Sequence, residues 1–214
     1  MCYINEPVKK FVEDLSAKLP APGGGAAAAL AGALASGLNC MVGNFTAGNE
    51  KYASVSEDIK ELLENSVKYR EELLILMESD IEVYGNYSRA SKLPVSTDAE
   101  KSMREKAVQD AVKKAAEIPY NIMIVCGNVL KVCEPLAIKG NKNLLSDVGV
   151  AALFAGAAIK AAYLNVLVNF LYLKDEPFKC KILKETKLML FESERIESLV
   201  MEGCKKKLKW QHSD

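Results

Sequence analysis

The chain has 214 residues, half of them hydrophobic, and its 28 Lys and Arg balance its 28 Asp and Glu. This length and composition predict one domain, residues 1–214, with a sizeable buried core. Because no net charge attracts phosphate groups, we expect neither a nucleic acid nor an anionic membrane surface as a partner.

The cysteines and the single histidine restrict the chemistry further. The six cysteines form no CxxC pair and show no metal-ligand spacing, so we expect reduced thiols, no metal site and a cytoplasmic location. The only histidine is His212, two residues from the end, which argues against mechanisms that need an imidazole. The most apolar stretches, 24–46 and 148–173, contain asparagines or a lysine, and we expect neither to span a membrane.

Apolar residues recur with helical spacing along the first third of the chain. Residues 6–19 are predicted to form an amphipathic helix, with Asn5 as its cap and Pro7 in its first turn. One face of this helix carries its apolar side chains: Val8, Phe11, Val12, Leu15 and Leu19. A PAPGGG loop and an apolar helix over 25–46 follow.

Two long helices are predicted next, over about 54–90 and from about 98 to 136. Pro119 lies inside the second, but the apolar spacing continues in phase beyond it, which predicts one kinked helix rather than two. The stretch KGNKNLLSD then breaks the pattern, with Gly140 as a C-cap and Ser146 or Asp147 as an N-cap.

An apolar helix to about residue 173 and a charged amphipathic helix over about 179–209 complete the chain. No stretch alternates with a period of two, so the predicted fold is an all-α, up-and-down bundle of about six helices, two of them long. The apolar helices are expected at its centre. Helices this long can also pair with a second copy, and we expect a homodimer.

The glycine loop is the first candidate for function. Three residues without side chains, Gly23, Gly24 and Gly25, precede a helix whose first N–H groups have no partner within the helix. A carboxylate, phosphate or carbonyl oxygen could bind these donors. The alternative is a turn between antiparallel helices.

Polar residues in apolar surroundings are the second candidate. KGNKNLLSD places Lys142, Asn143 and Asp147 between two apolar helices, where capping does not account for all of its polar side chains. Asn165 with Asn169, and Asp80 with Tyr84, are spaced i, i+4 and each pair shares a helix face. A polar cavity for a heterocycle or a structural network between helices would satisfy them. The basic run KKKLK at 205–209 is interpreted as a solvated helix end.

Four stretches resemble the cyclodeaminase/cyclohydrolase family of folate enzymes, which includes the C-terminal domain of formiminotransferase-cyclodeaminase. They occur in the family's order over residues 20–175: PAPGGGAAAALAGALASGL, DIEVYGNYSRASKLP, GNKNLLSDVGVAA and NVLVNFLYLKD. Ala21 and Ala26 depart from the pattern, because the family often has hydroxyl residues there. This puts side-chain hydrogen bonds at those positions in doubt, but not the backbone donors.

The resemblance implies an all-helical homodimer that binds a one-carbon tetrahydrofolate, with no cofactor beyond this substrate. Two reactions are open: 5-formiminotetrahydrofolate closing to 5,10-methenyltetrahydrofolate with loss of ammonia, which we narrowly favour, or hydrolysis of the methenyl compound to 10-formyltetrahydrofolate. A non-catalytic helical interaction protein, or an enzyme for another pterin or amidine, remains the alternative.

The resemblance also suggests roles for the polar residues. Asp147 or Asp80 would be the acid or base, since a desolvated carboxylate has a raised pKa. Asn143, Asn165 and Asn169, with Tyr84 beside Asp80, would contact the pterin. The glycine loop would bind a pterin carbonyl or a glutamate carboxylate, and Lys92 or Lys142 a polyglutamate tail.

Overall fold

The computed structural model describes residues 2–208, which form six α-helices and three short 3-10 helices, with no strand among them. The α-helices are α1 (Val8–Ser16), α2 (Gly24–Thr46), α3 (Ser56–Ala90), α4 (Asp98–Lys139), α5 (Leu145–Phe170) and α6 (Glu176–Leu208). The 3-10 helices are η1 (Tyr3–Asn5), η2 (Glu50–Val55) and η3 (Lys142–Leu144). The all-α prediction is confirmed. Three helices are long instead of the predicted two, because α6 is long as well as α3 and α4.

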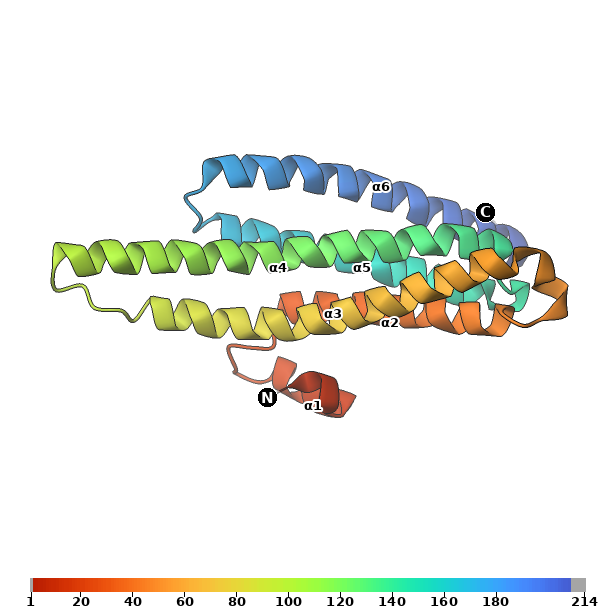
Figure 1. Ribbon diagram of the computed structural model, residues 1–214, viewed down its shortest axis with the longest axis horizontal. Helices are drawn as coiled ribbons and strands as arrows, with labels where there is room; N and C mark the ends of the chain where they lie inside the picture. Colours follow the sequence, from red (N-terminus) through yellow and green to blue (C-terminus); the bar gives the residue numbers. More distant parts are fainter. Residues whose placement is uncertain (1, 209–214) are drawn as a thin grey trace, which may run out of the picture.

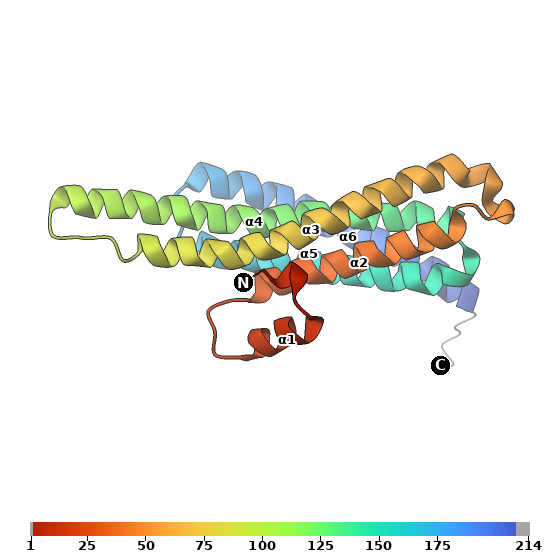
Figure 2. The same ribbon diagram turned by 60° about the horizontal axis from the view of Figure 1, so that its bottom comes forward.

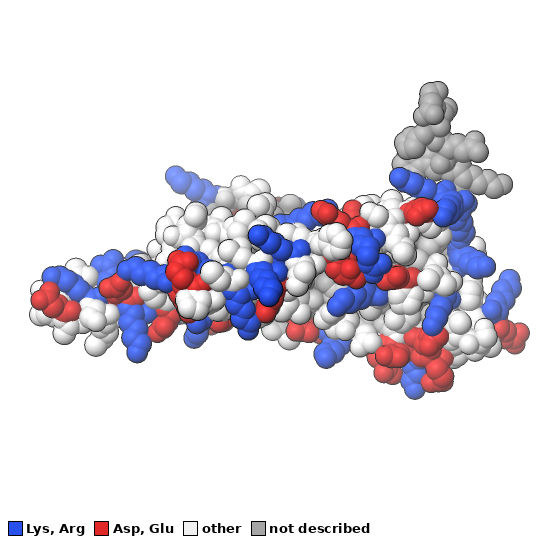
Figure 3. All heavy atoms as spheres, turned by 90° about the horizontal axis from the view of Figure 1, so that it is seen from above, with Lys and Arg blue, Asp and Glu red and all other residues white. Residues whose placement is uncertain are grey.

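Helices α2 to α5 form the bundle. α2 packs against α3 and α5, and α4 packs against the same two helices from the other side, while α6 lies along α4 and α5 (Figure 1). The paired ends of α3 and α4 project beyond the other helices. Basic and acidic side chains are intermixed on this projection and over the face that carries α6 (Figure 3).

Small residues let the central helices approach closely. A Cβ atom added to Gly32 of α2 would lie 2.5 Å from the sulfur of Cys126 on α4, so any other residue there would force that side chain to move. Burial raises the pKa of the Cys126 thiol to about 12. Buried Asn39 of α2 donates a 3.1 Å hydrogen bond to the Val129 carbonyl of α4, which satisfies a polar group inside the apolar core.

Helix α4 is one continuous helix of 42 residues although Pro119 and Pro135 both lie within it. Its start is fixed by a capping box, in which Thr97 accepts from the Glu100 N–H and the Glu100 side chain accepts from the Thr97 N–H. Gly140 is its C-cap, as predicted. The prediction of a single helix through Pro119 is therefore confirmed.

The predicted caps of α5 are wrong. The backbone first turns through η3, where Asn141 accepts a 3.1 Å hydrogen bond from the Asn143 N–H, and α5 then starts with Leu144 at its N-cap position. Ser146 and Asp147 therefore lie within the first turn of α5. That helix ends at Phe170, before residue 173, and α6 starts at Glu176, before residue 179.

Helix α1 lies outside the bundle (Figure 2), and η1, just before it, contacts α3. It is shorter than predicted, and Pro7, rather than Asn5, occupies its N-cap position. Of its predicted apolar face only Phe11 is buried, packed edge-on against Tyr3. The other four members of that face are exposed, namely Val8, Val12, Leu15 and Leu19.

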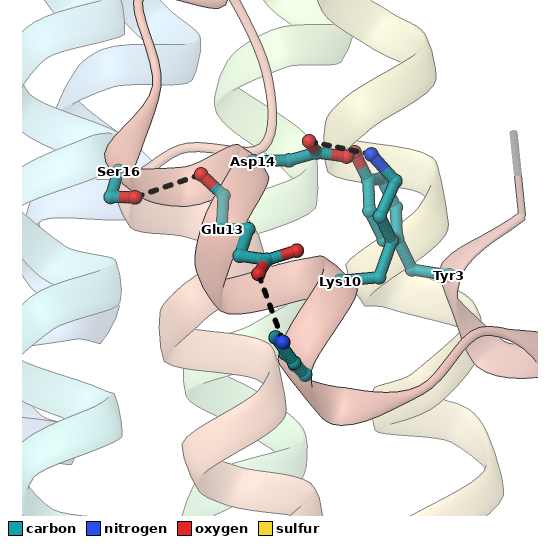
Figure 4. Close-up of polar contacts among 6 residues, drawn as sticks. Tyr3, Lys10, Glu13, Asp14 and Ser16 are labelled. Carbon is teal, nitrogen blue, oxygen red and sulfur yellow. Dashed lines mark hydrogen bonds and ion pairs between the residues drawn. The ribbon is translucent and has the colours of Figure 1, made fainter.

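One hydrogen bond fastens α1 to η1, and an ion pair within α1 holds the same carboxylate (Figure 4). The Tyr3 hydroxyl donates a 2.7 Å hydrogen bond to Asp14, and the Lys10 ammonium pairs with the same carboxylate at 2.8 Å. The hydrogen bond to Asp14 and burial raise the pKa of Tyr3 to about 12. η1 is in turn bound to α3, because the Ile4 N–H donates to Glu78 at 2.8 Å.

By length and composition alone, three helical segments are apolar enough to cross a membrane: Gly24–Thr46, Asp98–Lys139 and Lys142–Phe170. In this fold their most apolar windows are 61, 50 and 44% buried against other helices. The predicted absence of a membrane span stays a prediction.

Candidate active site

A cleft of about 410 Å³ opens at the end of the bundle where α2 begins. The PAPGGG loop, α3, α4 and α5 all contribute to its wall. Seven of the residues selected from the sequence line it together: Gly23, Gly24, Gly25, Asp80, Tyr84, Asn165 and Asn169. Residues 23 and 169 are far apart in the chain. They meet because α2 packs antiparallel to α5, so that the start of α2 and the end of α5 lie at the same end of the bundle.

Asp80 is the only charged residue among residues 2–208 that lines the cleft. Burial raises the pKa of its carboxyl above the ordinary 3.8, and the N–H of Ala26 at the start of α2 opposes part of that rise. A carboxyl group with a raised pKa exchanges its proton more readily near neutral pH than an exposed aspartate does. Asp80 is therefore the group in the cleft that is best suited to acid–base chemistry.

The glycines of the PAPGGG loop allow the side chains of Asp80 and Asn165 to lie close to the first turn of α2. A Cβ atom on Gly25 would lie 2.2 Å from Oδ1 of Asp80, and one on Gly24 would lie 3.3 Å from Nδ2 of Asn165. The carboxylate of Asp80 thus occupies the position beside the helix N-terminus that the sequence left open for a ligand anion. At Gly23, by contrast, an added Cβ would have nothing within 4 Å, so this residue borders open space.

The amide nitrogens of Asn165 and Asn169 donate to backbone carbonyls. Asn165 donates to Ala161 at 2.9 Å, and Asn169 donates to Asn165 at 2.8 Å and to Ala115 of α4 at 3.0 Å. Within residues 2–208 no donor reaches the Oδ1 atom of either side chain. Two amide oxygens are therefore left as hydrogen-bond acceptors at the cleft. The sequence analysis offered a structural network between helices and a polar cavity as alternatives, and these two side chains combine both: their nitrogens bind backbone and their oxygens stay free.

Aromatic and apolar residues that the sequence analysis did not select complete the wall. Tyr87 and Tyr172 stand beside Tyr84, and all three rings are exposed enough to reach a ligand. The remaining lining residues are apolar: Pro20, Ala21, Val83, Val112, Ala115 and Val168. The position of Tyr87 one turn after Tyr84 was a usable signal, whereas Val112 and Ala115 are contributed by α4 and only the fold reveals them.

Four selected residues lie elsewhere. Lys142, Asn143 and Asp147 belong to the segment at the other end of α2, where the N–H of residue 141 donates a 2.9 Å hydrogen bond to the Thr46 hydroxyl. By helical rise the 23 residues of α2 put this segment about 34 Å from the glycine loop. Lys92 is exposed in the turn after α3 and does not line the cleft. His212 and Lys209 lie outside residues 2–208.

Comparison with known proteins identifies the family of this chain. The family model for formiminotransferase-cyclodeaminase matches residues 7–188. A methenyltetrahydrofolate cyclohydrolase of Methylorubrum extorquens is 39% identical over 95% of this chain and 98% of its own length. A formimidoyltransferase-cyclodeaminase of Gallus gallus is 30% identical over 92% of this chain, which spans 37% of that protein's length.

A solved structure is also similar. The formiminotetrahydrofolate cyclodeaminase of Thermotoga maritima superposes with a TM-score of 0.80 and 30% sequence identity, covering 96% of this chain and 97% of that one. Together these comparisons identify a helical enzyme of folate one-carbon chemistry. The chain belongs to the formiminotransferase-cyclodeaminase family.

Proposed function

We propose that the cleft binds a one-carbon derivative of tetrahydrofolate and that the protein hydrolyses 5,10-methenyltetrahydrofolate to 10-formyltetrahydrofolate. The observation that carries this proposal is the half-buried carboxylate of Asp80, the one charged group among the described residues of the cleft, beside two free amide acceptors. The 39% identity to a methenyltetrahydrofolate cyclohydrolase along nearly its whole length favours hydrolysis over the deamination that the sequence analysis narrowly preferred.

The reaction moves both protons of one water molecule: one passes through Asp80 to N5, and the other is released to solvent. Water adds to the methenyl carbon that joins N5 and N10, and ionised Asp80 accepts a proton from this water as the C–O bond forms. The tetrahedral carbon then loses its bond to N5. Protonated Asp80 returns the proton to N5 as that bond breaks, and the hydroxyl on the carbon loses its proton to solvent, leaving the formyl group on N10 and releasing one proton overall. A raised pKa suits both steps, because the group must accept and release a proton at one pH.

Binding and orientation fall to the other lining residues. The acceptor oxygens of Asn165 and Asn169 match the N–H donors on the edge of a pterin, and the tyrosine rings offer flat surfaces for stacking. The apolar residues around Asp80 exclude bulk water, so that a bound water molecule is the one that reacts.

Deamination of 5-formiminotetrahydrofolate is the second candidate, because the structurally similar Thermotoga maritima protein is a formiminotetrahydrofolate cyclodeaminase. There N10 would attack the formimino carbon, Asp80 would take the N10 proton, and ammonia would leave with a proton from the same carboxyl group. Both reactions pass through a tetrahedral carbon between N5 and N10, so one cleft can serve either.

Turnover of the purified protein decides between them. We expect faster loss of methenyl absorbance from 5,10-methenyltetrahydrofolate than in the enzyme-free control. A rise of methenyl absorbance from 5-formiminotetrahydrofolate, with ammonia released in equal amount, would instead identify the deaminase. If both traces match the control, neither reaction is catalysed.

The remaining expectations stay proposals. We propose a cytoplasmic enzyme that needs no cofactor beyond its folate substrate and that accepts a polyglutamate tail. A non-catalytic interaction protein is not compatible with membership of this enzyme family.

A further inference from the structure

One aromatic residue in the wall of the cleft lies outside the helices. Tyr84 and Tyr87 belong to α3, whereas Tyr172 belongs to the turn 171–175, which joins α5 to α6. The backbone hydrogen bonds of the helix itself fix a residue of α3, but the place of a turn residue depends on contacts from other elements. What holds the 171–175 turn therefore decides where the ring of Tyr172 stands.

A side chain of α4 holds the backbone of this turn. The amide nitrogen of Gln109 donates a 3.1 Å hydrogen bond to the Tyr172 carbonyl, and its amide oxygen accepts a 2.8 Å hydrogen bond from the Lys174 N–H. Figure 1 shows the turn beside α4. Because a glutamine amide offers both a donor and an acceptor, one side chain satisfies a backbone group on each side of Leu173, which is itself buried. Within residues 2–208, no other side chain makes a hydrogen bond to the backbone of residues 172–174.

The end of the turn is fixed separately. Lys113, one helical turn after Gln109 on α4, forms a 2.7 Å ion pair with Asp175. Asp175 also accepts a 3.0 Å hydrogen bond from the Phe178 N–H and so caps the start of α6. These contacts place the start of α6, but they do not reach the backbone of residue 172, which is left to Gln109.

The start of the turn is joined to the polar groups of the cleft. The Tyr172 N–H donates a 3.2 Å hydrogen bond to the carbonyl of Asn169, whose amide nitrogen donates to the Ala115 carbonyl of α4 at 3.0 Å. Asn169 and Ala115 both line the cleft. Gln109 and Ala115 thus bind one stretch of chain, residues 169–174, to α4 at two points, and this stretch forms part of the cleft wall.

We propose that Gln109 is a positioning residue of the cleft, which sets the ring of Tyr172 as a wall on which the pterin of the substrate stacks. Gln109 does not line the cleft, so it acts through Tyr172. A wall that is in place before the substrate arrives does not have to be ordered on binding, which lowers the free-energy cost of association. The part played in substrate binding rests on the proposed function, whereas the contact with the turn does not.

The kinetics of Gln109→Met test this role, because methionine keeps the length of the side chain and removes both hydrogen bonds. We expect KM for 5,10-methenyltetrahydrofolate to rise about 10-fold, the usual cost of ordering a mobile side chain on binding. Turnover at saturation should change by less than about twofold, since Asp80 and the reacting carbon stay in place. A fall of kcat with KM unchanged would overturn the proposal.

Glu105→Gln is the matched control for these kinetics. Glu105 lies one helical turn before Gln109 on α4 and pairs with Lys174 of the same turn, but the two side chains are 60 and 71% exposed. An ion pair this exposed contributes little, so KM should equal that of the wild type. The same rise of KM in Glu105→Gln as in Gln109→Met would show that any disturbance of the turn has this effect.

The dependence on Tyr172 is tested by a double-mutant cycle. Tyr172→Ala should raise KM by itself, because it removes the stacking surface. If Gln109 acts through this ring, adding Gln109→Met to Tyr172→Ala should raise KM no further. A role confined to general stability would add its full effect in both backgrounds, and that result would overturn the proposal.

Hydrogen exchange tests the contact with the turn and needs no activity. The Lys174 amide should exchange about 10-fold faster in Gln109→Met, because its acceptor is lost. The amide of Tyr84 on α3 should keep its wild-type rate. Unchanged exchange at residue 174 would overturn the contact. If the wild type turns over neither folate, the proposed function fails and the role in substrate binding fails with it, while exchange at residue 174 still decides whether Gln109 holds the turn.

Discussion

At the scale of single residues, two opposing electrostatic effects act on the Asp80 carboxyl where it contacts the first turn of α2. The N–H groups at a helix start favour a negative charge, while burial disfavours it. Burial is the larger effect, since the pKa of Asp80 is raised despite the nearby Ala26 N–H. The glycines at 24 and 25 make this arrangement possible, because any side chain at residue 25 would occupy the place of the carboxylate.

Replacing Asp80 by asparagine should therefore separate activity from stability. We expect turnover to fall about 100-fold to 10,000-fold, the usual contribution of a positioned acid–base group. An acid with a raised pKa binds its proton more tightly in the folded protein, so its ionisation destabilises the fold as pH rises above the ordinary 3.8. Asp80→Asn should accordingly have a higher Tm than the wild type at pH 7, and the difference should shrink as pH is lowered toward 3.8.

Thermal unfolding at several pH values checks the second part of this prediction. Asp147→Asn is the comparison, because Asp147 is an aspartate in the first turn of α5 and lies outside the cleft. A Tm for Asp80→Asn that stays below that of the wild type at every pH would contradict the account of its pKa.

Gly25→Ala should damage both the fold and the site. The added Cβ would lie 2.2 Å from Asp80, and overpacking of this kind costs about 1–3 kcal/mol. Gly127→Ala is the matched control, because Gly127 is also within a helix but has nothing within 4 Å of an added Cβ. That variant should gain about 0.5–1 kcal/mol. Denaturant unfolding measures both, and equal effects would show that the close contact does not matter.

At the scale of elements, α2 and α5 carry the site because they run antiparallel. The start of α2 and the end of α5 then lie at one end of the bundle, where the glycines meet Asn165 and Asn169. α3 passes the same end and presents Asp80 with Tyr84 from one face of a helix. Rigid helices thus hold the polar groups, and the PAPGGG loop contributes backbone and apolar surface.

The attachment of α1 depends on one carboxylate. Two hydrogen bonds lower the pKa of Asp14, the larger effect coming from Lys10 and the smaller from Tyr3. A lowered pKa means that the stabilisation is present above the ordinary 3.8 and is lost as pH falls through the lower, folded value. Asp14→Asn should release α1 already at pH 7, which hydrogen exchange of the amides at 8–16 would detect.

Glu13→Gln is the control for that prediction. The Lys9–Glu13 pair spans 3.6 Å between side chains that are 84 and 57% exposed, so it should contribute little. Unchanged exchange in Asp14→Asn, or equal acceleration in Glu13→Gln, would show that the hydrogen bond between Tyr3 and Asp14 does not hold α1.

At the scale of the whole molecule, one cleft at one end of the bundle couples ligand binding to global stability. A ligand that binds only the folded state adds about 2.7 kcal/mol at 100 times its Kd. For a protein of this size that corresponds to a rise in Tm of about 5–11 °C. We expect such a rise with 5-formyltetrahydrofolate, measured at fixed protein concentration.

Asn165→Leu should abolish most of that rise, because it removes an acceptor from the cleft while keeping a side chain of similar size. Leu188→Asp, far from the cleft on α6, should keep it. A rise of the same size in Asn165→Leu and the wild type would place folate binding elsewhere.

Helical spacing, prolines and glycines along the chain were enough to predict the all-α bundle, the single helix through Pro119 and the Gly140 cap. These features depend on neighbours within a few turns, which a sequence displays directly. Pairs spaced i, i+4 identified Asp80 with Tyr84 and Asn165 with Asn169 for the same reason. The start of α5 was mispredicted, because Asn141 satisfies the local backbone through η3 and makes a side-chain cap unnecessary.

Which of the selected residues share a cleft was decided only by the tertiary structure. The polar pattern around Lys142, Asn143 and Asp147 is as strong as that of the residues in the cleft. These three residues nevertheless lie at the far end of α2, since the chain reverses direction between helices. Val112 and Ala115 line the cleft only because α4 packs beside α3 and α5. The sequence by itself therefore determined the helices and their chemistry, and packing between distant segments determined the site.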